Sequence, residues 1–240
     1  PIGNKYMTEI TGSTLARFRD HEIEEEGKSP STVKKYLAMF SRAINKVKSE
    51  HNVPITLNPV TQITMPLEPP INDRVLSKEE WERLLKVCSQ KPPYFMKHIV
   101  VARETLCRRG ELLRLRKEDI DWIDGTARIT KTKNGIPRTI GLSPLCLEIL
   151  QSLPETPDGR FFPMKTDHQF SSYWRKVLRD AKLKGEFTFH RLRHQGATDL
   201  AEEDWTISEL SAQGGWKSLA SLKRYTHIQG SHLAQKMKKR

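Results

Sequence analysis

The chain has 240 residues, enough for one large domain or two small domains with buried cores. Its 41 Lys and Arg outnumber its 29 Asp and Glu, and residues 1–70 hold only nine of the basic and eight of the acidic ones. The second part carries the excess positive charge, which predicts a phosphate-rich partner. No apolar run approaches the roughly 18 residues of a membrane span, and no secretory signal pattern opens the sequence, so we expect no membrane partner.

Two amphipathic patterns in the first part predict a pair of helices. Residues 11–27 and 29–52 carry apolar side chains at helical spacing, after a polar start and a Ser-Pro start respectively. The opposite face of the second pattern holds Lys34, Lys35 and Arg42. These side chains suit either a solvated surface or contacts with DNA phosphates.

A proline-rich stretch then divides the sequence. Residues 54–70 contain five prolines and lose the helical period, which is typical of a linker. We therefore expect a helical domain over residues 1–66, a linker over 67–76, and a second domain with a C-terminal tail over 77–240.

The sequence of the second domain predicts helices interrupted by one small hairpin. Ser77 and Glu80 form a capping-box pattern, and β-branched residues on both sides of Asn134 and Gly135 indicate the hairpin. The expected fold class is therefore mainly α with a small β-sheet, an α+β arrangement in two domains. The predicted helices cover residues 76–88, 94–107, 111–122, 144–153, 168–183, 190–203, 206–214 and 218–227.

The cysteines and histidines do not form a metal-binding pattern. Cys88, Cys107 and Cys146 lie far apart without a CxxC spacing, and no HExxH occurs. His190 and His194 lack a third ligand at a suitable spacing. We expect free, buried thiols in a reducing compartment and no metal.

Several basic residues permit two interpretations each. Arg108 follows an apolar helix, where it either caps the helix end in water or is held by Glu111 to bind an anion. His190 and Arg193 share one helix face. They are either ordinary surface charges or two groups that bind the same phosphate. Lys133 near the hairpin tip is either solvated or able to donate a proton to a leaving alkoxide.

Four motifs, taken together, resemble the tyrosine recombinases, the phage-integrase family of site-specific DNA strand-exchange enzymes. In chain order they are CRRGELL, TKNGIPRTIGL, HRLRH and GGWKSLASLKRYTH, and the last holds Tyr225. One such motif would be weak, but four in this order are specific. The resemblance covers residues 74–240 and, more weakly, 7–66, which are similar to the helical core-binding domain of integrases.

The resemblance implies a reaction without metal, ATP or another cofactor. Tyr225 attacks the scissile phosphate and becomes joined to the 3′ phosphate, while Arg108 and Arg193 hold its free oxygens. Lys133 protonates the departing 5′ hydroxyl; Lys131 faces the same side of the strand and is the alternative.

The remaining site residues follow from the same motifs. His190 supports the phosphate and proton movement, and Trp216 stands where the family more often has histidine. The indole N–H can donate a hydrogen bond but cannot act as a base. Glu111 is expected to orient Arg108, whereas His194 and His227 are interpreted as structural residues or phosphate neighbours.

The family also implies partners. We expect two domains that clamp double-stranded DNA at specific recombination sites, and a homotetramer joined by exchange of the tail over residues 228–240, with accessory DNA-bending proteins as further partners. The protein is expected to be bacterial or phage-encoded and to act on DNA in the cytoplasm. The candidate DNA-binding residues are Lys34, Lys35, Arg42, Lys131, Arg138 and Arg191.

Two other functions stay open at this point. A type IB topoisomerase uses similar residues to relax DNA, and a catalytically silent regulator would only bind it. The sequence also leaves open the DNA target, the outcome among integration, excision, inversion and resolution, and the presence of an arm-binding domain ahead of residue 1.

Overall fold

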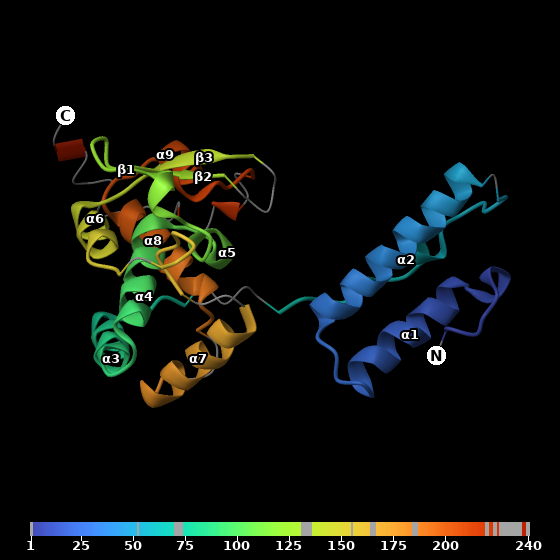
Figure 1. Cartoon of the computed structure of the whole chain (residues 1–240). Coiled ribbons are helices and arrows are strands. Elements are labelled where there is room, and N and C mark those ends of the chain that lie inside the picture. Colours follow the sequence, from blue (N-terminus) through green and yellow to red (C-terminus); the bar gives the residue numbers. More distant parts are fainter. Residues whose placement is uncertain are drawn as a thin grey trace. The chain divides into compact units, whose positions relative to one another are not determined.

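The computed structural model divides the chain into two compact units, Pro1–Asn72 and Asp73–Arg240 (Figure 1). The boundary falls inside the segment expected to be a linker. We describe each unit by itself. The residues that the structure describes are 2–51, 53–69, 74–130, 136–154, 156–163, 167–183, 187–218, 221–222, 225 and 237–238.

The first unit is built on a pair of helices, as the sequence predicts. α1 (Gly12–Glu24) starts where Thr11 accepts a hydrogen bond from the backbone of Thr14, and Ser29 caps α2 (Pro30–Glu50) in the same way. The short 3-10 helix η2 (Pro59–Gln62) packs against both. The hydrophobic core of this unit consists of Leu15, Phe18, Val33, Leu37, Ile44 and Val60.

The second unit is mostly helical and contains a small antiparallel sheet, which confirms the predicted fold class. In Figure 1, α4 and α8 lie side by side at its centre; α6, α9 and the sheet lie toward one end, and α3 and α7 toward the other. Its elements are α3 (Lys78–Ser89), α4 (Pro93–Thr105), α5 (Arg109–Leu112), η3 (Lys117–Asp119), β1 (Ile120–Asp121), β2 (Thr126–Ile129), β3 (Arg138–Gly141), α6 (Pro144–Gln151), α7 (Asp167–Asp180), α8 (His190–Glu202) and α9 (Ile207–Gly214).

The helix predicted over residues 111–122 is wrong. Only the short α5 forms there; residues 113–114 make a turn, and the chain then passes into η3 and β1. Leu115 O accepts from the backbone of Phe161, and Lys117 N donates to Gly159 O, so beyond the first turn the chain pairs with a distant segment and the helix does not continue. Leu112, Leu113 and Leu115 are all buried, so this short helical turn is anchored in the core.

The sheet has the order β1-β2-β3, with one strand more than the predicted hairpin. Ile129 lies opposite Arg138, so eight residues, 130–137, separate the paired strands. A two-residue turn at Asn134 and Gly135 would instead pair Ile129 with Ile140. The turn itself lies outside the described residues. The observed register brings Arg138 level with the end of β2.

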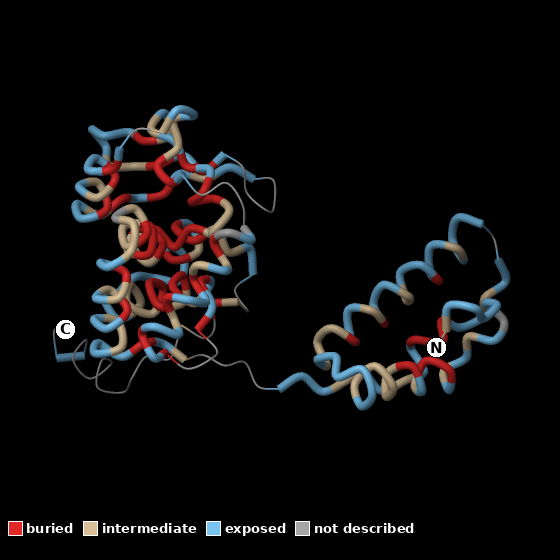
Figure 2. Tube along the Cα trace, turned by 60° about the horizontal axis from the view of Figure 1, so that its bottom comes forward, coloured by how far each residue is buried: buried red, intermediate tan, exposed pale blue. Residues whose placement is uncertain are grey.

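A glycine permits the closest contact between the two central helices. A Cβ atom on Gly196 of α8 would lie 2.0 Å from the carbonyl oxygen of Arg103, near the end of α4. The missing side chain therefore lets α8 press directly on the α4 backbone. Figure 2 shows buried segments through the middle of this unit, and both α4 and α8 contribute buried residues to its core.

The cysteines are free and buried, as predicted, and burial raises the pKa of Cys107 to about 11. None of the helices in the described ranges is both long and apolar enough to cross a bilayer. The core also buries a histidine: His98 is 0% exposed and stacks on Phe162 with the ring centroids 4.2 Å apart. Neither of its ring nitrogens has a hydrogen-bond partner among the described atoms.

His98 should make the second unit sensitive to acid. Burial, aided by the nearby charge of Arg109, lowers the pKa of His98 to about 3 from an ordinary 6.5. Between these two values the unfolded chain binds more protons than the folded one, so stability falls as the pH falls. From pH 7 to pH 5 the expected contribution of His98 is a loss of about 2 kcal/mol.

Urea unfolding at both pH values, followed by tryptophan fluorescence, measures this loss. All five tryptophans lie in the second unit, so the signal reports on that unit. The variant His98→Leu should lose about 2 kcal/mol less than the parent between pH 7 and pH 5. Equal losses in the two proteins would contradict the assignment.

Candidate active site

The site begins at the abrupt end of α4. Leu106 adopts a left-handed backbone with φ of 55°, and the chain turns so that Arg108 caps the next helix, α5. The carboxylate of Glu111 accepts from the backbone N–H of Arg108 at 2.9 Å and from its Nη1 at 2.8 Å. The contact expected between these two residues is therefore present.

Arg138 differs from its expected position. It is a predicted DNA-binding residue, but its side chain turns inward and is only 12% exposed. Its Nη1 and Nη2 donate to the two oxygens of Glu111 at 3.1 and 2.9 Å, and its Nε donates to Gln213 O at 3.1 Å. These acceptors hold the guanidinium inside the protein. We call Arg108, Glu111 and Arg138 the arginine–carboxylate cluster.

Two opposing effects set the ionisation of Glu111. Its side chain is 1% exposed, and this burial by itself would raise the pKa of the carboxyl group. The hydrogen bonds from Arg138 and Arg108 outweigh burial and lower the pKa to about 2. Glu111 is therefore a fixed anion between two cations at any neutral pH.

Arg193 lies beneath this cluster and is almost fully buried. It is 2% exposed, and its Nη1 donates to Leu106 O at 2.5 Å and to Gly214 O at 2.6 Å. Burial, followed by the charges of Arg108 and Arg138, lowers its pKa to about 10, so the group stays charged at neutral pH. Its Nε has no hydrogen-bond partner among the described residues.

Trp216 covers Arg193 because the preceding chain leaves room for the indole. The guanidinium carbon of Arg193 lies 3.8 Å from the ring centroid, a cation–π contact. A Cβ atom on Gly214 would lie 1.9 Å from the Trp216 ring, so glycine is required there. Arg108 Nη2 donates to the adjacent Gly215 O at 3.1 Å, which joins this loop to the cluster.

Tyr225 also lies next to the indole. Its ring centroid is 5.8 Å from that of Trp216, and its hydroxyl forms a hydrogen bond with Nδ1 of His194. The ring of His194 meets that of His190 edge to face at 5.0 Å. Leu222 is 0% exposed and anchors the segment before Tyr225 in the core. The backbone N–H of Tyr225 donates to the carbonyl oxygen of Leu222 at 2.9 Å.

The structure thus brings together five of the six predicted catalytic residues. Arg108, Arg193, Trp216, Tyr225 and His190 are linked through direct contacts or shared neighbours. Their catalytic roles remain predictions. The sixth residue, Lys133, lies outside the described residues, as do Lys131 and His227.

The other candidate DNA-binding residues lie on the surface. Lys35 and Arg42 are exposed on α2, and Lys34 pairs with Glu68 at 2.7 Å. Arg191 is partly exposed, and its Nη1 reaches Arg74 O at 3.4 Å. Their proposed contacts with DNA stay predictions.

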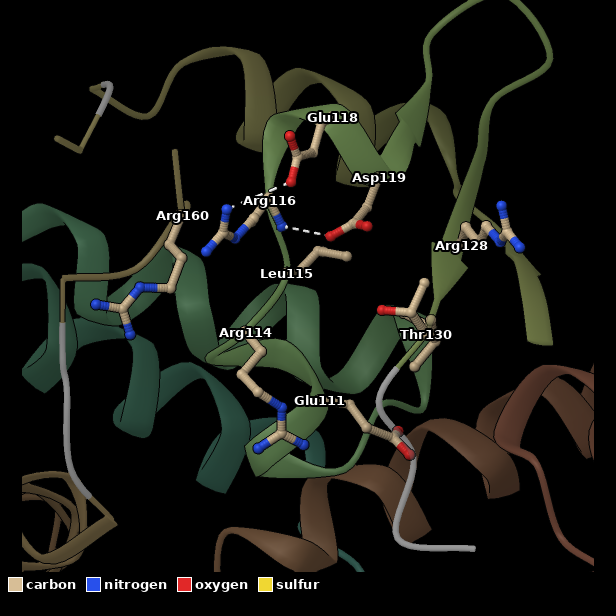
Figure 3. A pocket seen from close by; sticks show the side chains of 10 residues that line it. Glu111, Arg114, Leu115, Arg116, Glu118, Asp119, Arg128, Thr130 and Arg160 are labelled. Atoms are coloured by element: carbon tan, nitrogen blue, oxygen red, sulfur yellow. Dashed lines mark hydrogen bonds and ion pairs between the residues drawn. The ribbon is translucent and has the colours of Figure 1, made fainter. Parts of the chain in front are cut away.

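A basic cavity behind Glu111 was not expected from the sequence. Its volume is about 460 Å³, and Figure 3 shows guanidinium groups around it from three separate segments. Glu118 pairs with Arg116 at 3.3 Å, and Glu111 is engaged by the cluster, so part of the acidic lining is already neutralised. The sequence of β2 held one sign of this cavity: apolar and polar residues alternate there, so Arg128 points away from the core between buried Ala127 and Ile129. The arginines of the cavity, which we call the arginine cavity, are Arg114, Arg116, Arg128 and Arg160.

Comparison with known proteins identifies the class of protein. The family model described as "Phage integrase family" matches residues 74–232, which include the cluster, Arg193, Trp216 and Tyr225. A fold of the same kind occurs in a lambda integrase dimer bound to a COC′ core site, with a TM-score of 0.76 and 20% identity, over 93% of this chain and 82% of that chain. The chain belongs to the phage integrase family.

Curated relatives extend over nearly the whole sequence. The shufflon-specific DNA recombinase of Escherichia coli is 32% identical over 99% of this chain, and the integrase of Salmonella phage P22 is 26% identical over 91% of it. The chain spans 63% and 62% of the length of these two relatives. The resemblance inferred from the four sequence motifs is confirmed at the level of the family.

The arginine–carboxylate cluster should be important for stability. Arg138→Gln leaves Glu111 buried with one cationic partner, and such a change typically costs about 3 kcal/mol or more. The exposed pair of Arg116 with Glu118 provides a matched control, and Arg116→Gln should cost less than about 1 kcal/mol. Urea unfolding followed by tryptophan fluorescence compares the two. Equal losses would contradict a structural role for Arg138.

Proposed function

We propose that the protein is a site-specific DNA recombinase that cuts and rejoins duplex DNA through a 3′-phosphotyrosine intermediate. The observation that carries the proposal is the cluster of Tyr225, Trp216, Arg193 and Arg108 in one chain. Membership of the phage integrase family supports it, and so does the similarity to a shufflon-specific DNA recombinase.

The chemistry requires positive charge beside the attacking oxygen. A tyrosine hydroxyl has an ordinary pKa of about 10 and is a weak nucleophile at neutral pH. As its oxygen attacks phosphorus, negative charge accumulates on the non-bridging oxygens, and guanidinium groups stabilise that charge. Arg108 and Arg193 are the groups that would do so here.

Preorganisation is the main contribution of the fold. Arg193 is already desolvated and fixed by two carbonyl oxygens, so it need not reorganise when the phosphate arrives. Arg108 is held by Glu111, whose carboxylate is in turn held by Arg138. Lys133 would then protonate the departing 5′ oxygen. The bond energy is kept in the phosphotyrosine, so a free 5′ hydroxyl can reverse the step without ATP.

Assembly is the remaining part of the proposal. Strand exchange between two sites requires four protomers, and a lambda integrase tetramer on a Holliday junction has a related fold, with a TM-score of 0.71. We propose that this chain forms a tetramer on DNA through its tail. That segment lies almost entirely outside the described residues.

Replacing the nucleophile gives the direct test. Tyr225→Phe removes the attacking oxygen and keeps the ring that contacts Trp216, so DNA binding should persist while every covalent product disappears. The measurement uses plasmids bearing candidate sites from the genomic neighbourhood, with crossovers mapped by sequencing and adducts detected on nicked duplexes. Covalent adducts formed by Tyr225→Phe would refute the proposal, and relaxation of plasmids without crossovers would favour a topoisomerase.

The arginine cavity offers a second test, of the DNA contact. Guanidinium groups on a surface next to the site suit backbone phosphates. Arg128→Gln should lower the slope of log K against log salt by about 1, without changing sequence preference. Arg179→Gln is the matched control, because that side chain is 75% exposed on α7, where we infer no DNA contact. Fluorescence anisotropy at several salt concentrations gives both slopes, and equal slopes would place the DNA elsewhere.

A further inference from the structure

The partner of the Tyr225 hydroxyl is a residue to which the family motif assigned no catalytic role. The contact comes from Nδ1 of His194, whereas the expected histidine, His190, lies one turn earlier on α8 and is exposed. We propose that His194 holds the hydroxyl of Tyr225 and accepts its proton when the oxygen attacks phosphorus. This inference rests on the proposed function.

Because His194 lies on α8, its imidazole is held in a fixed position relative to Arg193 and can position the hydroxyl of Tyr225. His194 directly follows Arg193, the buried phosphate-binding candidate, so both side chains project from one helical turn. Gly196 locks this part of α8 against the α4 backbone. The distance between the guanidinium group and the imidazole is therefore set by a rigid helix instead of a loop.

The environment of Tyr225 fits the same role. Its ring is near both the indole of Trp216 and the imidazole of His194, with ring centroids 5.8 and 6.0 Å away. Trp216 also covers Arg193, and an indole cannot accept a proton. The imidazole in contact with the hydroxyl can accept one, because a neutral imidazole has one ring nitrogen with a free lone pair.

The proton and electron balance of the step is complete. A neutral His194 with its proton on Nε2 presents a lone pair on Nδ1 to the hydroxyl of Tyr225. As the bond from Oη to phosphorus forms, the Oη–H bond breaks and its proton moves to Nδ1. The P–O5′ bond breaks with its electron pair on O5′, which takes a proton from Lys133. In the reverse step His194 returns its proton to Oη.

Removal of the imidazole should slow the covalent step and leave DNA binding intact. His194→Ala is expected to lower the rate of adduct formation on a nicked duplex by about 100-fold or more. His168→Ala on α7, an exposed histidine, is the control and should react at the parental rate. A rate for His194→Ala within threefold of the parent would overturn the proposal.

A modified substrate separates this role from that of the general acid. Sulfur in place of the 5′ bridging oxygen leaves as a thiolate, whose conjugate thiol has a pKa near 8.5, so its departure needs no proton. The sulfur substrate should restore the rate of Lys133→Ala but not that of His194→Ala. Restoration of both would overturn the assignment of His194 to the tyrosine side.

The variant His194→Gln distinguishes positioning of the Tyr225 hydroxyl from acceptance of its proton. Its amide keeps a hydrogen-bonding group near the hydroxyl but cannot take a proton at neutral pH. We expect a folded protein that is slowed by at least about 10-fold on both substrates. A parental rate for this variant would overturn the proton-transfer step.

One readout requires no DNA and so separates failure of this inference from failure of the proposed function. The chain has five tyrosines, and 3-fluorotyrosine labelling with Tyr225→Phe assigns the fluorine resonance of Tyr225. His194→Ala should shift that resonance, and His168→Ala should not. An unshifted resonance overturns the contact, whereas a parent protein that forms no adduct on any DNA refutes the recombinase function alone.

Discussion

The structure of the site depends on one buried carboxylate held between two guanidinium groups. Glu111 is 1% exposed and accepts hydrogen bonds from both Arg108 and Arg138. A buried anion is costly unless it is paired, and these two cations supply the pairing. In return, the carboxylate fixes Arg108 beside the loop that carries Trp216. One ionic contact therefore joins the end of α4, strand β3 and the loop after α9.

This arrangement explains how several guanidinium groups can lie close together in the folded protein despite their mutual repulsion. Arg193 lies in the same region, and burial, followed by the charges of Arg108 and Arg138, lowers its pKa, although only to about 10. Carbonyl oxygens and the face of Trp216 compensate part of the cost of burying it. The remaining positive field is available to a phosphate, which is the ligand that the proposed reaction would bring.

The sequence was sufficient for local features and for motif order. Ser77 with Glu80 does form a capping box, and the apolar periods gave α1 and α2. It was misleading where distant segments decide the outcome. The helix expected over 111–122 gave way to pairing with residues 159–161, and Arg138 turned inward because Glu111, 27 residues away in the chain, attracts it. Such contacts have no signature in the local spacing.

His194 shows the same limit at the level of chemistry. His194 follows Arg193 in the sequence, and from the sequence alone it is interpreted either as a structural residue or as a neighbour of the phosphate. Only the folded chain, in which the segment with Leu222 returns to pack against α8, brings its ring to the hydroxyl of Tyr225. Since consecutive residues on a helix point about 100° apart, Arg193 can face the protein interior while His194 faces the tyrosine. A single turn of α8 can thus address both the phosphate and its nucleophile, and the rigidity of that turn limits how far the two can drift apart.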